Sequence, residues 1–200
     1  MERLRAGGVV NFVVNTHYLA EQLDAHFDGV ADVTTIHEQD ILETGGGVKN
    51  ALHLLGDKPF FAVNTDAIWL EGPYPALARL RRHWDAEAMD ALLLLQPTVR
   101  AFDYSGSGDY RLDTEGRAMR RVEGEVVPYV FSGVQILHPR LFEGAPDGAF
   151  SLNRLYDRAQ TAGRLYGLPH DGEWYHVGTP EALAQAESII AHGQTKSNTR

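Results

Sequence analysis

Two stretches of the sequence combine residue types and spacings that suit a nucleotide-type ligand and a metal ion. The first is Glu43-Thr44-Gly45-Gly46-Gly47, followed from Val48 to Leu55 by apolar residues spaced i, i+3, i+4 and i+7, as on one face of a helix. Because glycine has no side chain, a ligand could come close to this backbone and meet free N–H groups at the positive end of the helix dipole. The residues leave open the alternative that the three glycines only form a flexible left-handed turn.

The second stretch is an apolar segment, Phe60 to Val63, that continues into Asn64-Thr65-Asp66. Asp66 therefore lies at the carboxyl end of a predicted parallel strand, where open α/β sheets bind their ligands. A carboxylate in this position can hold Mg²⁺, which usually takes one or two protein carboxylates together with substrate phosphates. The alternative is that Asp66 only caps the following turn.

His176 is a third candidate because of where its segment ends. The short predicted strand from Trp174 to Val177 turns through Gly178 into Thr179-Pro180-Glu181, which is typical of a helix start. We therefore expect His176 to point outward at the end of the strand. A lone histidine is more often a surface or core residue, and only a second site group nearby would favour a functional role.

The elements that must position these residues alternate between strand and helix. Apolar patterns predict strands at 9–14, 32–38 and 60–63, with helices between them over 17–28, capped by Thr16, and over 48–55. This order is the signature of a parallel α/β sheet. A further helix is expected after Pro73 and Pro75.

The second half of the chain changes character. Residues 90–96 form a continuous apolar run ended by Pro97, which favours a strand buried on both faces. Residues 100–128 are polar and glycine-rich, which predicts short antiparallel strands around 110–112 and 119–122. The remaining expectations are a strand over 129–137 interrupted at Ser132-Gly133, a helix over 151–162, short strands at 165–168 and 174–177, and a final helix from 179.

Composition narrows the function classes. The chain has 200 residues, a formal net charge of −9 and no cysteine. The acidic balance argues against a nucleic-acid surface, and the lack of cysteine excludes disulfides, thiolate zinc sites and cysteine nucleophiles. No apolar run has membrane-spanning length and no signal peptide is evident, so a cytoplasmic setting is expected. We expect one domain over residues 1–192 and a disordered polar tail over 193–200.

Two familiar glycine motifs are absent. Gly47-Val48-Lys49-Asn50 does not supply the Gly-Lys-Ser/Thr of a phosphate-binding P-loop, and Asn50 stands where a dinucleotide fingerprint needs its third glycine. Ordinary ATPase and NAD-dependent activities are therefore disfavoured.

Taken together, the motifs resemble those of the sugar-1-phosphate nucleotidyltransferases, most nearly the bacterial N-acetylmuramate-1-phosphate uridylyltransferases and the mannose-1-phosphate guanylyltransferase-like proteins. The resemblance runs in matching order through 13–27, 42–69, 129–137 and 174–183. It implies an α/β fold with a Rossmann-like, mostly parallel sheet, helices on both faces and a small antiparallel substrate-binding sub-sheet. It also implies that Glu43 to Gly47 meet the nucleobase and ribose, that Asp66 binds Mg²⁺, and that Ser132 and Gly133 line the sugar pocket.

Three departures from the family pattern matter. The N-terminal strand and glycine-rich phosphate loop have no counterpart here, so the chain is expected to be N-terminally incomplete by at least about 30 residues, including a strand between 9–14 and 60–63. His176 stands where the family has a second metal-binding Asp; histidine is a poor ligand for Mg²⁺, so it would contact a phosphate or accept Mn²⁺. A sugar-phosphate lysine is also absent, so Arg120 or Arg121 would take its place, and Glu123 would bind a sugar hydroxyl.

The implied reaction couples a nucleoside triphosphate to a sugar 1-phosphate, giving an NDP-sugar and pyrophosphate, with Asp66 and His176 as the catalytic pair. These two substrates are then the expected partners, with neither nucleic acid nor membrane involved. The alternative is a domain that binds a sugar nucleotide without turning it over, which the missing phosphate loop and His176 both favour. The sequence leaves the nucleobase, the sugar and the oligomeric state open.

Overall fold

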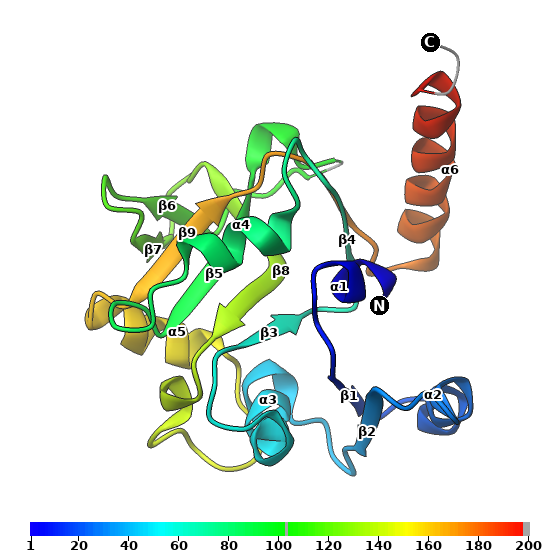
Figure 1. Cartoon of the computed structure of the whole chain (residues 1–200). Helices are drawn as coiled ribbons and strands as arrows, with labels where there is room; N and C mark the ends of the chain where they lie inside the picture. The colour runs from blue at the N-terminus through cyan, green and yellow to red at the C-terminus, as the bar shows by residue number, and fades with distance from the viewer. Residues whose placement is uncertain (103, 198–200) are drawn as a thin grey trace.

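The central sheet joins segments that are far apart in the chain (Figure 1). The computed structural model describes residues 1–102 and 104–197. Its sheet contains β3 (Phe60–Val63), β8 (Tyr129–Leu137), β5 (Ala91–Pro97) and β9 (Leu165–Pro169), side by side in that order. β5 and β9 are parallel, whereas β8 is antiparallel to both β3 and β5, so three of the four strands run in one direction. The predicted mostly parallel α/β fold is confirmed.

The apolar run of β5 is buried on both faces of this sheet, as predicted. Leu93 and Leu95 pack into one core, while Leu92 and Leu94 pack into another, because successive side chains of a strand point to opposite faces. The first core is covered by α3 (Glu43–Leu55) and α5 (Asn153–Thr161), and the second by α4 (Ala76–His83) and α1 (Glu2–Ala6). Helices therefore cover both faces of the sheet.

A small antiparallel sub-sheet extends the central sheet, also as predicted. β6 (Tyr110–Leu112) and β7 (Ala118–Arg120) form a hairpin, which joins β8 where Tyr110 pairs with Tyr129. A separate antiparallel pair consists of β4 (Ala67–Leu70) and β10 (Glu173–His176). The sequence patterns do not predict β4, which directly follows Asp66.

The N-terminal strands form a sheet of their own. β1 (Phe12–Thr16) pairs in parallel with β2 (Val33–His37), and α2 (Ala20–Phe27) connects them (Figure 1). The prediction that Thr16 caps the helix is wrong, because Thr16 is the last residue of β1. α2 begins after Leu19, whose φ of 56° is left-handed. Among the described residues, β1 does not pair with β3.

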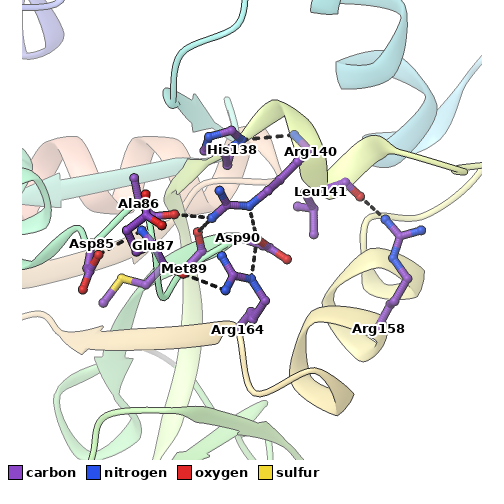
Figure 2. Close-up of polar contacts among 10 residues, drawn as sticks. All are labelled: Asp85, Ala86, Glu87, Met89, Asp90, His138, Arg140, Leu141, Arg158 and Arg164. Atoms are coloured by element: carbon purple, nitrogen blue, oxygen red, sulfur yellow. Dashed lines mark hydrogen bonds and ion pairs between the residues drawn. The ribbon is translucent and has the colours of Figure 1, made fainter.

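An ionic cluster fastens one end of the central sheet (Figure 2). The Asp90 carboxylate accepts hydrogen bonds from Arg140 Nε at 2.5 Å and Arg164 Nε at 2.8 Å, which tie together the segments beside β5, β8 and β9. Arg140 also donates to the carbonyls of Ala86 and Met89. Partial burial acts to raise the pKa of Asp90, but the two arginine hydrogen bonds outweigh it and hold that pKa below its usual value.

The remaining elements are two short 3₁₀ helices, η1 (Thr98–Arg100) and η2 (Pro139–Phe142), and the final helix α6 (Pro180–Ser197). Figure 1 shows α6 projecting away from the sheets. The helix continues past residue 193, where the sequence predicted the start of a disordered tail, and residues 198–200 lie outside the described part. No described helix is both long and apolar enough to cross a membrane.

Candidate active site

A cavity of about 380 Å³ lies beside the first half of β8, where β3 and β10 end, near the start of α6. It contains four residues that the sequence singled out, namely Asp66, Ser132, Gly133 and His176. The other lining residues are Asn64, Ala67, Phe102, Tyr104, Val130, Phe131, Trp174, Tyr175, Ala182, Gln185 and Ala186.

Asp66 and His176 come together at this cavity. The imidazole Nδ1 of His176 lies 3.9 Å from the Asp66 carboxylate, and the two side chains are 59% and 48% exposed. The pairing of β4 with β10 explains the approach, because His176 stands opposite Ala67 and the Val177 N–H donates to the Asp66 carbonyl at 2.7 Å. Asp66 is therefore the second site group near His176 that a functional role for this histidine requires.

The two side chains suit a divalent cation shared with a substrate. Asp66 supplies the hard oxygen donor that Mg²⁺ prefers, while the imidazole of His176 is better suited to Mn²⁺. Within residues 1–102 and 104–197, no cluster of three or more His, Asp or Glu side chains is placed to hold a metal. The donors fit an ion whose remaining ligands are phosphate oxygens and water.

Gly133 positions the segment that carries Asp66. The sequence predicted an interruption of the strand at Ser132-Gly133, but β8 continues through these residues. The register of its pairing with β5 shifts between Leu93 and Leu95. Gly133 has a φ of +82°, and its carbonyl accepts the Asn64 N–H at 2.9 Å. A Cβ at this position would lie 3.0 Å from the Cβ of Asn64. Glycine is needed both for the backbone conformation and for this close approach.

Ser132 faces the protein with its side chain. Its hydroxyl is fully buried and donates to the Leu94 carbonyl at 2.8 Å, while its own carbonyl accepts the indole N–H of Trp174 at 2.9 Å. The whole residue is buried, and its part in a sugar pocket stays a prediction. Trp174 thereby fastens β10, and with it His176, to β8.

The glycine segment lies inside α3 and not in a loop before it. The N–H groups of Gly45 and Gly46 both donate to the Phe150 carbonyl, at 2.8 and 3.1 Å, and the Thr44 hydroxyl accepts the Leu152 N–H at 3.1 Å. The expectation of free N–H groups at Gly45 and Gly46 is therefore wrong. None of the three glycines has a positive φ, so the left-handed turn is also absent.

Close packing explains two of these glycines instead. A Cβ at Gly45 would lie 2.4 Å from the Phe150 ring, and one at Gly46 would lie 2.3 Å from the Gly148 carbonyl oxygen. Glu43, which precedes them, is one of two described non-glycine residues with a left-handed backbone, at a φ of 57°. Such strain often accompanies a functional site, and here it lies in the segment predicted to meet the nucleotide.

Two polar residues beside this segment were not singled out from the sequence. The Asn15 amide donates to Glu38 Oε1 at 2.7 Å and to the Gly47 carbonyl at 3.0 Å, and Glu38 Oε2 accepts the Leu42 N–H at 3.3 Å. A Cβ at Gly47 would lie 2.8 Å from Glu38 Oε1. Both residues follow the apolar part of a strand, which was the signal available for finding them.

Aromatic side chains form another part of the site that the sequence did not indicate. Phe102, Tyr104 and Tyr175 line the cavity, and the rings of Phe102 and Tyr175 lie 5.5 Å apart. Phe102 and Tyr104 belong to an irregular segment whose spacing follows no helix or strand period, so no sequence signal marked them.

The expected sugar-phosphate residues lie elsewhere. Arg120 and Arg121 line a second cavity of about 330 Å³, and Phe131 lines both cavities. Glu123 is exposed on the neighbouring turn and lines neither of these two cavities. Its contact with a sugar hydroxyl stays a prediction.

Comparison with known proteins gives close relatives. No protein-family model matches the chain. It is 38% identical over 198 residues to the N-acetylmuramate alpha-1-phosphate uridylyltransferase of Caulobacter vibrioides, covering 96% of this chain and 82% of the relative. It is 30% identical over 196 residues to the protein of the same name from Neisseria meningitidis, covering 94% of this chain and 81% of that relative.

Solved structures share the fold at lower identity. HddC from Yersinia pseudotuberculosis, solved in complex with GMP-PN, has a TM-score of 0.73 at 20% identity, over 95% of this chain and 83% of the other. A UDP-glucose pyrophosphorylase in complex with UDP-glucose has a TM-score of 0.73 at 12% identity, over 96% and 84%. The sequence relationship shows that the chain belongs to the sugar-1-phosphate nucleotidyltransferases, enzymes that join a nucleoside triphosphate and a sugar 1-phosphate into an NDP-sugar.

Proposed function

We propose that this chain transfers the uridylyl group of UTP to N-acetylmuramate α-1-phosphate, giving UDP-N-acetylmuramate and pyrophosphate. The observation that carries this proposal is the 38% identity to the Caulobacter uridylyltransferase, which spans nearly the whole chain. The Asp66–His176 pair, which lines the larger of the two cavities, supports the proposal as the place where the phosphates would react.

The reaction needs positioning and charge neutralisation more than covalent chemistry. An oxygen of the sugar 1-phosphate attacks the α-phosphorus of UTP, the bond to the β-phosphate oxygen breaks, and pyrophosphate leaves with its electron pair. Nucleotidyltransferases of this family generally use a divalent metal ion. Bound between Asp66 and His176, Mg²⁺ or Mn²⁺ would supply neutralisation of the phosphate charge.

The two substrates are assigned to different segments. We place the nucleobase and ribose against Glu43, Thr44 and Gly45 to Gly47, where the strained backbone of Glu43 marks the start of α3. Because the N–H groups of Gly45 and Gly46 are already bonded, recognition there would use other groups of the segment. We place the sugar against Ser132 and Gly133, with Arg121 in the cavity that adjoins at Phe131.

The test is a turnover assay with paired substrates. The chain is incubated with UTP or GTP, with N-acetylmuramate 1-phosphate or mannose 1-phosphate, and with Mg²⁺, Mn²⁺ or EDTA. Pyrophosphate release and the mass of the product are measured. We expect UDP-N-acetylmuramate as the main product and no product with EDTA. A preference for another pair of substrates would overturn the proposed specificity. Binding of UDP-N-acetylmuramate by calorimetry without any turnover would support the binding-domain alternative.

A further inference from the structure

The second cavity adjoins the proposed sugar site but is chemically different from it. It is lined by residues of the β6–β7 hairpin, β8 and the start of α5. These residues are Asp109, Tyr110, Arg120, Arg121, Phe131 and Asn153. Phe131 also lines the larger cavity, so the two cavities share one lining residue. The two cavities therefore adjoin at Phe131.

Arg121 carries the positive charge of this cavity that no carboxylate neutralises. Its Nε donates to the Gly108 carbonyl at 3.0 Å, which orients the guanidinium through a neutral partner. Arg120, in contrast, forms an ion pair with Asp157 at 3.1 Å. Among the residues that the structure describes, Arg121 has no carboxylate within ion-pair distance.

Apart from its two arginines, the cavity is lined by one acidic residue, so the formal charge of its lining is positive. Asp109 is its acidic residue, and its Oδ2 is engaged by the Phe131 N–H at 2.8 Å. Tyr110 and Asn153 are neutral. In a protein with a net charge of −9, an arginine left unpaired in a cavity is a local exception, and the planar guanidinium matches a carboxylate in geometry.

We propose that Arg121 binds the carboxylate of the sugar substrate and so selects sugars that carry an acidic ether substituent. This inference rests on the proposed function: N-acetylmuramate is N-acetylglucosamine with a lactic acid ether at O3, and its carboxylate is the second anionic group besides the 1-phosphate. The 1-phosphate must react beside Asp66 and His176. The carboxylate therefore needs a different cation, and Arg121 lines the adjoining cavity.

The experiment compares two ligands that differ only in the lactyl group. Calorimetry gives the dissociation constants of UDP-N-acetylmuramate and UDP-N-acetylglucosamine for the wild type, for Arg121→Gln and for Arg117→Gln. Arg117 is a matched control because it lies on the same hairpin, pairs with Glu115 and lines neither of these two cavities. Arg121→Lys, which keeps the charge without the planar fork, is a second variant, and thermal melting checks that each protein is folded.

We expect the wild type to prefer the lactyl ligand and Arg121→Gln to lose at least about tenfold of that preference, with Arg117→Gln unchanged and Arg121→Lys intermediate. An equal loss for both ligands would show that Arg121 contacts their common part and would overturn the inference. So would an unchanged preference, or equal binding of both ligands by the wild type. Failure of the wild type to bind either ligand would instead overturn the proposed function, and the inference with it.

Discussion

The His176 imidazole lies 3.9 Å from the Asp66 carboxylate, although a large part of the chain separates the two residues. Their approach is a consequence of backbone pairing, because β10 lies antiparallel to β4 and brings Val177 against the Asp66 carbonyl. The pair is therefore held by the fold and does not depend on mutual attraction between half-exposed side chains, which is weak in water.

Asp66→Asn should abolish turnover and leave the protein folded. The amide keeps the size of the side chain but removes the charge that would hold a cation against the phosphates, so we expect kcat to fall at least about 100-fold. Pyrophosphate release measures the rate, and circular dichroism with thermal melting checks the fold. Activity within a few-fold of the wild type would rule out Asp66 as the metal ligand.

His176→Asp should change the preference between metal ions. A second carboxylate replaces the imidazole, and Mg²⁺ prefers oxygen donors to nitrogen. We expect the ratio of activity in Mg²⁺ to activity in Mn²⁺ to rise about tenfold or more relative to the wild type. His176→Asn, which removes the imidazole without adding charge, serves as the control. If the ratio is the same in all three proteins, His176 does not contact the ion.

Gly133→Ala should lower both stability and activity. The new methyl group meets Asn64 while the backbone keeps a φ of +82°, so we expect a loss of about 1–3 kcal/mol in the free energy of unfolding, together with a reduced kcat as Asp66 shifts. Gly124→Ala is a close control, because Gly124 has a φ of +84° but no atom within 4 Å of the added Cβ. Urea titration and turnover assays measure both effects. Equal consequences for the two variants would mean that contact with Asn64 is unimportant.

Asp90→Asn should destabilise the protein in a pH-dependent way. The pKa of Asp90 is lowered in the folded state, so its contribution is fully present above the unfolded pKa of about 3.9 and is lost as the pH falls through the lower folded value. We expect a cost of about 1–3 kcal/mol at neutral pH, because Arg140 and Arg164 would lose their shared anion.

The difference between wild type and Asp90→Asn should shrink as denaturant titrations are taken below about pH 4. Asp147→Asn provides the comparison: Asp147 is also paired, with Lys49 at 2.6 Å, but it is fully exposed, and exposed pairs contribute little. A cost at Asp90 that is the same at all pH values would show that the carboxylate charge is not what stabilises the cluster.

The sequence predicted the parts of this fold that depend on simple periodicity. The leucine run of β5 is long enough to indicate burial on both faces, and Asp66 is recognisable because it follows an apolar strand. β4 escaped prediction because it is only four residues long and only three residues separate it from β3. The continuity of β8 through Gly133 also escaped prediction, because an irregular register depends on the partner strand.

The glycine segment shows a different limit of sequence reasoning. Three adjacent glycines predict a backbone that something approaches closely, and that is correct. What approaches Gly45 and Gly46 is the protein's own segment at Gly148 to Phe150, and no local pattern identifies a partner so far along the chain. The pairing of Asp66 with His176, in contrast, was expected through the family resemblance, and no periodicity in the sequence brings these two distant residues together.

The separate β1–β2 sheet has a consequence for local stability. A two-stranded sheet is marginal alone, so residues 12–37 depend on contacts with the rest of the protein, among them the Asn15 hydrogen bond to the Gly47 carbonyl. Gly47, which accepts this bond, belongs to the segment that we propose binds the nucleotide. A ligand that binds this segment only when residues 12–37 are folded shifts their local unfolding equilibrium toward the folded state by mass action. Saturating nucleotide should then protect residues 12–37 from proteolytic nicking and slow their amide exchange.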